Sequence, residues 1–291
     1  MTFRELYSMG CEKLNKLGIE EAKLDARLLL LNAFSLTNAE YLLCQDKDIY
    51  DFVSNAEECS IKYEQYINER SLRKPLQYIL SCTEFMGLDM WCEEGVLIPR
   101  QDTETLCEEI LANNKDTELR VLDMCTGSGC IASAISYYGL YKNITAADIS
   151  DKAVKIAEIN LSKYAKNGFR LVQSDLFEAF KDDSGCPLET FDIIVSNPPY
   201  IKTSVIEELE PEVREYEPKL ALDGDYDGLR FYRKISSEAR AFLSSGGKLY
   251  YEIGYDQGEE LCIILEELGY SDIKVIKDLR GLDRVVSASL Y

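Results

Sequence analysis

The chain has 291 residues, contains no histidine and carries a formal net charge of −20, from 52 acidic and 32 basic residues. Without imidazole it lacks the usual general base and the Ser-His and Cys-His nucleophile systems, so any chemistry must use other groups. The acidic balance would repel a phosphate backbone, which disfavours a nucleic-acid substrate.

The apolar residues come in runs far shorter than the roughly 20 residues that a membrane span needs, so we expect no membrane association. The first five residues, Met1 to Glu5, carry an early acid and no apolar stretch, which indicates no secretory or transit peptide. Ten scattered cysteines without paired spacing are typical of free thiols and predict no metal site. These features together predict a cytoplasmic protein.

The first part of the chain, residues 1–72, has a helical pattern. Leu6, Met9, Leu14 and Leu17 form one apolar stripe, and no proline interrupts the region. A capping box is expected at residues 37–40, and residues 51–70 fit one long amphipathic helix. We therefore predict a small N-terminal helical bundle for substrate recognition, with no catalytic motif of its own.

Residues 73–99 have a different character, since prolines and glycines separate short β-prone pieces at 76–80 and 83–86. This pattern indicates a β-hairpin linker. From residue 100 to 291, short apolar runs alternate with helical spacers; the runs are 120–124, 144–148, 169–172, 191–195, 248–253, 273–277 and 285–290. Such alternation predicts an α/β, Rossmann-like domain with a mainly parallel sheet and an antiparallel pair at one edge.

The first strand of this domain runs into a turn of small residues, Cys125-Thr126-Gly127-Ser128-Gly129, and then into a helix. Glycines let the backbone approach a ligand closely. The second strand ends in Asp148, nineteen residues after Gly129 (148 minus 129), where such units place a carboxylate on ribose hydroxyls. The pattern predicts a cofactor that contains adenosine.

The turn excludes a P-loop, because no Lys followed by Ser or Thr comes after its last glycine. It satisfies the relaxed dinucleotide fingerprint through Ala132, which leaves a nicotinamide enzyme open. Asp123 favours S-adenosylmethionine, because its carboxylate would attract the ammonium of a methionine moiety but would repel a pyrophosphate. After the third strand, Asp175 is a candidate acceptor for the adenine amino group, and Leu176 or Phe177 for packing on the ring.

The fourth strand is followed by Asn197-Pro198-Pro199-Tyr200, at the edge where open α/β sheets bind ligands. The two prolines fix the backbone and donate no N–H. The Asn197 side-chain oxygen and the Pro198 carbonyl can therefore each accept one hydrogen of a planar NH2 group, which aims its nitrogen at the methyl donor. Tyr200 would stack on this group and exclude water. We predict an N-methyltransferase that needs no histidine.

Together with further motifs, these residues resemble the HemK/PrmC family of protein-(glutamine-N5) methyltransferases. The likeness covers nearly the whole chain and includes the motifs at 75–79, 84–87, 98–104, 123–129, 197–200 and 217–224. The resemblance implies that the Cys125 to Gly129 loop, Asp148 and Leu176 bind S-adenosylmethionine, with Asn197 touching both cofactor and substrate. The implied substrate is the glutamine of the Gly-Gly-Gln motif in class 1 peptide chain release factors, gripped in part by the helical domain.

The chain departs from the family pattern at three positions, with Gln101 in place of proline and Ser81 and Cys125 in place of glycine. An alternative is an N-methyltransferase acting on an exocyclic amino group of a nucleobase in RNA or DNA, since the same four residues would hold that group. A nicotinamide-dependent oxidoreductase or a cofactor-free interaction module is a third reading of the same sheet.

Overall fold

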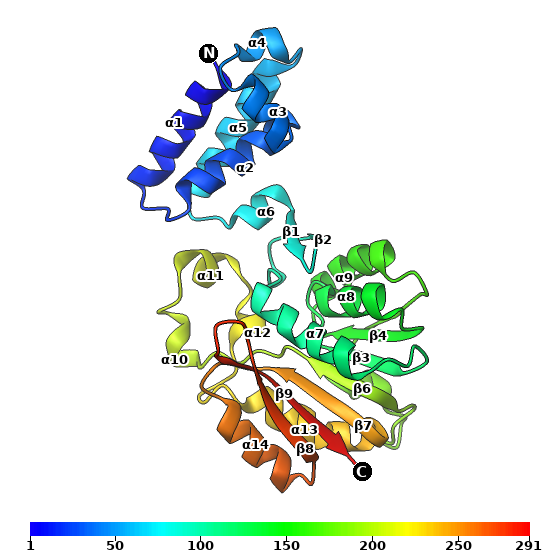
Figure 1. Ribbon diagram of the computed structural model, residues 1–291. Coiled ribbons are helices and arrows are strands. Elements are labelled where there is room, and N and C mark those ends of the chain that lie inside the picture. The colour runs from blue at the N-terminus through cyan, green and yellow to red at the C-terminus, as the bar shows by residue number, and fades with distance from the viewer. The chain divides into compact units, whose positions relative to one another are not determined.

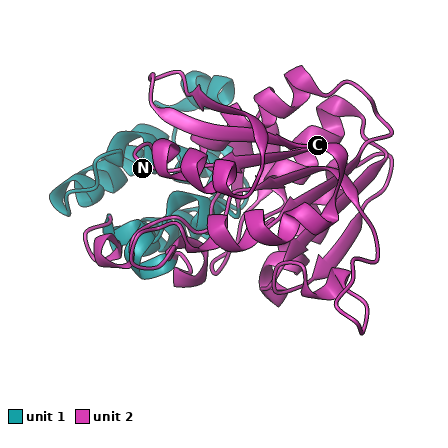
Figure 2. Ribbon diagram, turned by 90° about the horizontal axis from the view of Figure 1, so that it is seen from below, with its two compact units in different colours: residues 1–81, 210–216 teal, residues 82–209, 217–291 magenta.

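The computed structural model describes residues 1–291 and divides them into two compact units. Unit 1 comprises residues 1–81 and 210–216, and unit 2 comprises residues 82–209 and 217–291. Figure 2 shows unit 1 in teal and unit 2 in magenta. The three-part division at residues 72 and 99 stays a prediction.

Unit 1 is helical. Its helices are α1 (Phe3–Lys16), α2 (Ala22–Phe34), α3 (Asn38–Cys44), α4 (Ile49–Phe52), α5 (Ala56–Ser71), α6 (Leu76–Leu80) and α11 (Pro211–Tyr216). Phe3, Leu29 and Leu30 are fully buried in its core. The Thr37 hydroxyl and the Glu40 carboxylate form the predicted capping box at the start of α3.

A buried arginine holds α11 within unit 1. Arg70 in α5 donates to Asp25 of α2 at 2.6 Å and to Glu212 of α11 at 3.1 Å. Arg73 also donates to Glu212, at 3.3 Å. Residues 210–216 lie far along the chain from the rest of unit 1, so this charge cluster joins two distant parts of the sequence.

Two local predictions in unit 1 are wrong. The expected long helix over residues 51–70 is broken, because Val53 adopts an extended backbone and separates α4 from α5. The β-prone piece at 76–80 is the short helix α6, in which the amides of Tyr78 and Ile79 both donate to the carbonyl of Pro75. Proline favours the start of a helix, and a five-residue apolar run carries no decisive periodicity.

Unit 2 contains the predicted hairpin and the predicted mainly parallel sheet (Figure 1). The hairpin joins β1 (Cys82–Phe85) to β2 (Leu88–Trp91). The sheet has seven strands in the order β5-β4-β3-β6-β7-β9-β8. They are β3 (Arg120–Met124), β4 (Asn143–Asp148), β5 (Arg170–Gln173), β6 (Phe191–Ser196), β7 (Leu243–Glu252), β8 (Ser271–Lys277) and β9 (Asp283–Leu290). β9 runs antiparallel to both of its neighbours, β7 and β8, while the other pairs are parallel, which confirms the predicted antiparallel pair at one edge.

Helices cover both faces of this sheet, as Figure 1 shows. Alternate residues of each strand point to opposite faces, so Val121 of β3 joins one core and Leu122 the other. The first core includes α7 (Glu104–Asn113), α8 (Cys130–Gly139) and α9 (Asp151–Tyr164). The second includes α13 (Arg230–Phe242) and α14 (Gly258–Glu267). Because β3 pairs in parallel with both β4 and β6, the carboxyl ends of these three strands share one edge of the sheet.

Short helical pieces occupy the connections at that edge. They are α10 (Thr203–Ile206), α12 (Lys219–Leu222) and the 3-10 turn Gln101–Thr103. A further 3-10 turn, Glu178–Phe180, packs through Phe180 against Phe191 at the start of β6. No helix combines the length and the hydropathy needed to cross a bilayer.

Candidate active site

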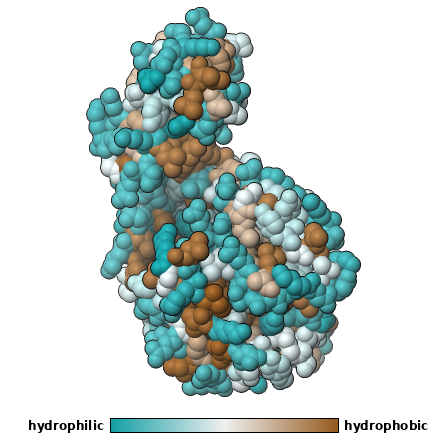
Figure 3. All heavy atoms as spheres, viewed as in Figure 1, coloured by the Kyte–Doolittle hydropathy of each residue, from teal (hydrophilic) through white to brown (hydrophobic).

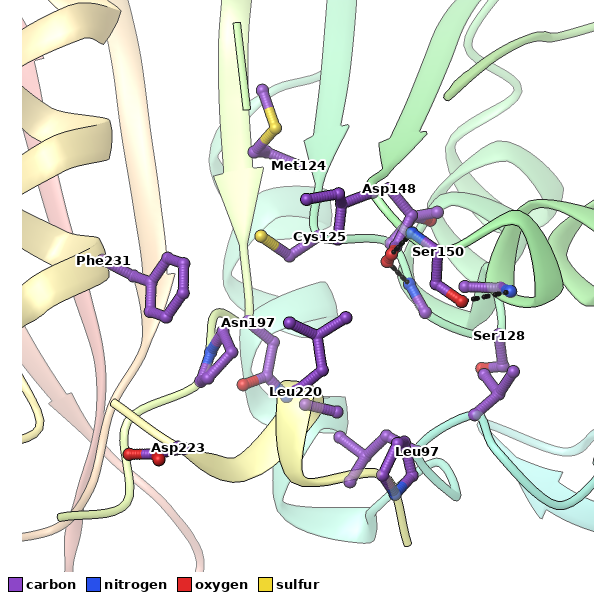
Figure 4. A pocket seen from close by; sticks show the side chains of 18 of the residues that line it. Leu97, Met124, Cys125, Ser128, Asp148, Ser150, Asn197, Leu220, Asp223 and Phe231 are labelled. Atoms are coloured by element: carbon purple, nitrogen blue, oxygen red, sulfur yellow. Dashed lines mark hydrogen bonds between the residues drawn. The ribbon is translucent and has the colours of Figure 1, made fainter. Parts of the chain in front are cut away.

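A cavity of about 610 Å³ opens in unit 2 at the carboxyl edge of the parallel strands. Its volume falls in the range of small-molecule sites. Its walls come from six stretches of the chain and α13; they include 95–100, 124–128, 148–150, 174–176, Asn197, Pro199, 219–221 and Phe231. Figure 4 shows Cys125, Asp148 and Asn197 approaching it from the ends of β3, β4 and β6, with the Phe231 ring pointing toward Asn197.

The turn after β3 leaves room for a ligand at Gly127. A Cβ built there meets no atom within 4 Å, and its φ of +55° is one that glycine adopts without strain. Gly129 has a different role, because its Cβ would lie 3.0 Å from Ala157 of α9. Gly127 therefore faces the cavity, while Gly129 allows α9 to pack closely against the turn.

Cys125 also has a left-handed backbone, with a φ of +62°. Ser81 shares this property, with a φ of +55°. Both are positions where the chain departs from a glycine of the resembled family, and the backbone explains the family's preference, since glycine has no Cβ to strain.

Asp148 is fixed by backbone donors on both of its oxygens. One oxygen accepts from the amide of Gly127 and the other from the amide of Ser150, each at 2.9 Å. Burial raises the pKa of Asp148, while the two amides lower it. A carboxylate oxygen can accept more than one hydrogen bond, so Asp148 keeps capacity for two ribose hydroxyls.

After β5, two of the three residues that were expected near adenine line the cavity. Leu176 is buried and lines the cavity, with a φ of +50°. Asp175 lines the rim and pairs with Lys234 of α13 at 3.4 Å. Phe177 does not line the cavity; it lies in the core and stacks on Phe242 at a centroid distance of 4.5 Å.

Asp123 does not lie where a cofactor ammonium was expected. It is fully buried beneath the turn, where it accepts from the Thr126 hydroxyl at 2.6 Å and from the Ala132 amide at 3.1 Å. Burial raises its pKa to about 7, and the two donors oppose this rise. The favoured role for Asp123 is therefore corrected to bracing the turn from within.

The Asn197 to Tyr200 segment follows β6 directly. The Asn197 side-chain nitrogen donates to the Thr103 hydroxyl at 3.4 Å, which leaves its Oδ1 without a donor. No donor reaches the Pro198 carbonyl either, so both predicted acceptors are free. Asn197 and Pro199 line the cavity, whereas Pro198 and Tyr200 lie outside its walls.

Tyr200 is held at both ends. Its hydroxyl donates to Glu252 at 3.2 Å, and its carbonyl accepts from the Gln257 side chain at 2.9 Å. Two glycines pack against its backbone, since a Cβ on Gly224 or Gly228 would lie 2.8 Å from its Cα or 2.3 Å from its carbonyl oxygen. The turn has no room to shift.

The sequence did not single out several of the residues that surround the site. Thr103 and Arg100 come from the 98–104 motif, and Leu220 comes from the 217–224 motif. Only the family resemblance, which includes both motifs, pointed to these three residues. Arg100 and the buried Glu217 form an ion pair that links the two segments. Phe231 and Glu252 had no signal of any kind.

The residues present fit a cofactor with an adenosine group. Open space at Gly127, the spare capacity of Asp148 and the apolar Leu176 are arranged around one cavity. None of these three features depends on Ala132, the small residue through which the turn satisfies the dinucleotide fingerprint.

Known proteins resemble the chain over its full length. A family model described as the PrmC N-terminal domain matches residues 5–80, and one described as the methyltransferase small domain matches residues 101–210. The release factor glutamine methyltransferase of Clostridium botulinum is 39% identical, with 100% of each chain covered. That of Geobacter sulfurreducens is 37% identical, covering 99% of this chain and 97% of the relative.

Solved structures share the fold of a large part of the chain. A methyltransferase from Pyrococcus furiosus is 20% identical, with a TM-score of 0.50, and the match covers 70% of this chain and 89% of the other. This likeness concerns the fold alone. Because full-length relatives reach 39% identity, the chain belongs to the release factor glutamine methyltransferase family.

Proposed function

We propose that this chain transfers a methyl group from S-adenosylmethionine to the side-chain amide nitrogen, N5, of the glutamine in the Gly-Gly-Gln motif of class 1 peptide chain release factors. The observation that carries this proposal is the free Asn197 Oδ1 beside a cavity that suits adenosine. The family relationship supports the choice of substrate, and the free Asn197 Oδ1 and Pro198 carbonyl support a site that would accept a planar NH2 group.

On the cofactor side, the turn Cys125, Thr126, Gly127, Ser128 and Gly129 would hold S-adenosylmethionine by its backbone, and Asn197 would touch it. Asp148 would accept from the ribose hydroxyls, while Asp175 and Leu176 would contact adenine. When bound, S-adenosylmethionine supplies an electrophilic methyl group on a sulfonium. The protein's part is to place the nucleophile in line with it.

On the substrate side, Asn197 Oδ1 and the Pro198 carbonyl would each accept one N–H of the glutamine amide. Pro199, which lines the cavity, would contact the amide, and the Tyr200 ring would shield it from outside the cavity wall. Accepting both hydrogens raises electron density on the nitrogen and stabilises the charge that develops on it. Asn197 and Pro198 would thus hold the amide nitrogen for attack on the methyl group that S-adenosylmethionine supplies, and the N–H proton lost on methylation would pass to water.

Unit 1 would bind the release factor. On the face seen in Figure 3, apolar side chains lie over the region of α3, where Leu42 and Leu43 are 56% and 80% exposed. Exposed leucines on a short helix give a protein partner an apolar surface. The partner is proposed to be protein rather than nucleic acid, and the setting is the cytoplasm, where release factors act.

The test uses purified full-length protein with labelled S-adenosylmethionine and a release factor. We expect label on the factor and none on a factor whose loop glutamine is replaced by alanine. Label on the replaced factor would overturn the proposal, and so would preferential labelling of RNA or DNA. Calorimetry with NAD alone should show no binding.

A second measurement addresses unit 1. Leu43→Asp should raise KM for the release factor several-fold without changing S-adenosylmethionine affinity. Leu188→Asp is the matched control, because Leu188 is 64% exposed in the loop that precedes β6, at the opposite edge of the sheet from the site. Equal effects of the two changes would contradict a docking role for α3.

A further inference from the structure

Two exposed tyrosines lie on connecting loops of unit 2. Tyr226 lies in the connection between α12 and α13 and is 76% exposed. Tyr255 lies in the connection between β7 and α14 and is 64% exposed. Neither residue lines the cavity, and neither has a part in the function proposed above. Because the fold does not bury these rings, both remain available to a partner.

The loop that carries Tyr226 is attached to the segment that follows Tyr200. The Thr203 amide donates to the Asp225 carbonyl at 3.1 Å, and the Thr203 hydroxyl donates to the Asp223 carboxylate at 2.6 Å. Asp225, the residue directly before Tyr226, lines the cavity. Tyr226 is therefore one residue away from the cavity wall, on a loop that lies beside the end of the Asn197 to Tyr200 turn.

The loop that carries Tyr255 is attached to the same segment. Asp256, the residue directly after Tyr255, forms an ion pair with Lys202 at 3.5 Å. Gln257, the next residue, donates from its side chain to the Tyr200 carbonyl at 2.9 Å. Tyr255 therefore lies on a second loop that contacts the backbone of this turn.

Gln257 also joins the two loops to each other. Its side-chain nitrogen donates to the carbonyl of Gly228, two residues after Tyr226, at 3.3 Å, and its oxygen accepts from the Gly254 amide at 2.9 Å. Gln257 is only 4% exposed, so water competes little for these hydrogen bonds. Both loops are thus fixed before any partner binds, and a partner would lose little free energy in ordering them.

The charged groups next to the two tyrosines are paired. Each acidic neighbour of either residue has a basic partner; the pairs are Asp225–Arg230 at 3.6 Å, Asp227–Arg233 at 2.6 Å and Asp256–Lys202 at 3.5 Å. This local balance differs from the net charge of −20 on the whole chain. Aromatic rings, and not unpaired charges, are therefore the main binding groups that this surface offers.

The chemistry of the proposed substrate suits such a surface. The two glycines of a Gly-Gly-Gln motif have no side chains that a pocket could recognise. Because they have no Cβ, their main chain can approach a flat ring closely. A tyrosine ring offers a large apolar face with a polar hydroxyl, and tyrosine is enriched among the residues that contribute most to protein binding.

We infer that Tyr226 and Tyr255 bind the glycine-containing main chain of the release factor beside the target glutamine. The inference rests on the proposed function, which supplies the occupant of this surface. A polypeptide that delivers its glutamine to Asn197 extends past the loops attached to Tyr200. These two tyrosines would add a binding surface in unit 2 to the one proposed at α3 in unit 1.

Steady-state kinetics with a release factor test the inference. We expect Tyr226→Ala and Tyr255→Ala each to raise KM for the factor about 10-fold, as when an aromatic side chain is removed from an interface. The kcat and the S-adenosylmethionine affinity should stay within about threefold of wild type, because neither residue lines the cavity. Tyr226→Phe and Tyr255→Phe keep the ring and should remain near wild type.

Tyr291→Ala is the matched control. Tyr291 is 78% exposed and follows β9, whose last residue, Leu290, pairs with Gly247 at the opposite edge of the sheet from the site. Its replacement should leave KM unchanged. A second measurement places the contact directly: Tyr226→p-benzoylphenylalanine and Tyr255→p-benzoylphenylalanine should crosslink on illumination to residues beside the target glutamine, as mapped by mass spectrometry.

The outcomes separate this inference from the proposed function. A wild-type KM in either alanine variant would overturn the inference for that residue. An equal rise in Tyr291→Ala, an equal rise in the phenylalanine variants, or crosslinks confined to other parts of the factor would overturn it for both. If the wild-type chain labels the loop glutamine while both alanine variants match its KM, only the inference fails. If the wild-type chain does not label the factor, the proposed function fails and the inference with it.

Discussion

Gly228 offers a direct way to displace the turn Asn197 to Tyr200, against which it packs. An alanine Cβ at this position would lie 2.3 Å from the Tyr200 carbonyl oxygen and 2.5 Å from the Gln257 side-chain nitrogen. Ordinary contact begins near 3.4 Å, so the backbone of Tyr200 must yield by about 1 Å. The clashing atom belongs to the backbone, so no side chain can swing away.

The magnitude follows from three contributions. Alanine at a φ of +76° carries about 1–2 kcal/mol of left-handed strain. Loss of the hydrogen bond from Gln257 to Tyr200 costs about 1 kcal/mol, and overpacking costs about 1–3 kcal/mol. We expect Gly228→Ala to lower the free energy of unfolding by roughly 3–6 kcal/mol. A displacement of about 1 Å should lower kcat about 100-fold.

Gly246→Ala is the matched control. Gly246 has a φ of +75°, and a Cβ added to it would meet nothing within 4 Å, so alanine there carries the same strain without the clash. Urea unfolding and methyl transfer to a release factor would be measured for both variants. If the two lose the same stability and the same activity, the argument that Gly228 supports the turn is refuted.

Three further predictions concern the site and its support. Asn197→Ala should lower kcat about 100-fold or more while S-adenosylmethionine affinity, measured by calorimetry, changes little, because the side chain orients the amide; loss of cofactor binding with normal turnover per bound cofactor would contradict this. Cys125→Gly should keep stability within about 1 kcal/mol of wild type, whereas Cys125→Val should lose about 2 kcal/mol more, since a β-branched residue fits a φ of +62° poorly; equal thermal stabilities would speak against strain at this turn. The folded-state pKa of Asp123 is raised to about 7, so the folded chain keeps a proton that the unfolded chain releases near pH 4, and stability should fall as pH rises between these values. The loss of stability should reach up to about 4 kcal/mol and should be absent in Asp123→Asn. Denaturation would be measured for both proteins from pH 4 to 8, and the same pH dependence in the two would contradict this prediction.

The sequence predicted the sheet well because strand signals there were local. Each of the seven apolar runs became a strand, and the last two form the antiparallel edge. The runs at 169–172 and 248–253 differ from their strands only at the ends, where β7 begins earlier, at Leu243. Short apolar segments were less decisive, as the helix at Leu76–Leu80 shows.

The site could be predicted only in part. Gly127, Asp148, Leu176 and Asn197 line one cavity, because strand ends of a parallel sheet meet at one edge. Their contacts with cofactor and substrate remain predictions. The sequence could not tell that Asp123 would lie beneath the turn, because this placement depends on the hydrogen bonds that Thr126 and Ala132 donate to it in the folded chain.

The residues that hold Tyr200 in place could not be predicted from the sequence. Glu252 lies 52 positions from Tyr200, and Gln257 lies 57 positions from it. No local pattern distinguishes such residues from any acid or amide at the end of a strand. Their roles depend on which strands become neighbours, and that is a property of the folded chain.

The path of the chain through unit 1 limits how the protein can be dissected. The backbone passes between the units three times, after residues 81, 209 and 216. A fragment that ends at residue 81 would leave the buried Arg70 without Glu212, one of its two carboxylate partners. A fragment that begins at residue 82 would carry α11 without the helices that enclose it. An engineer who wishes to exchange the helical bundle between relatives must therefore transplant two segments, not one.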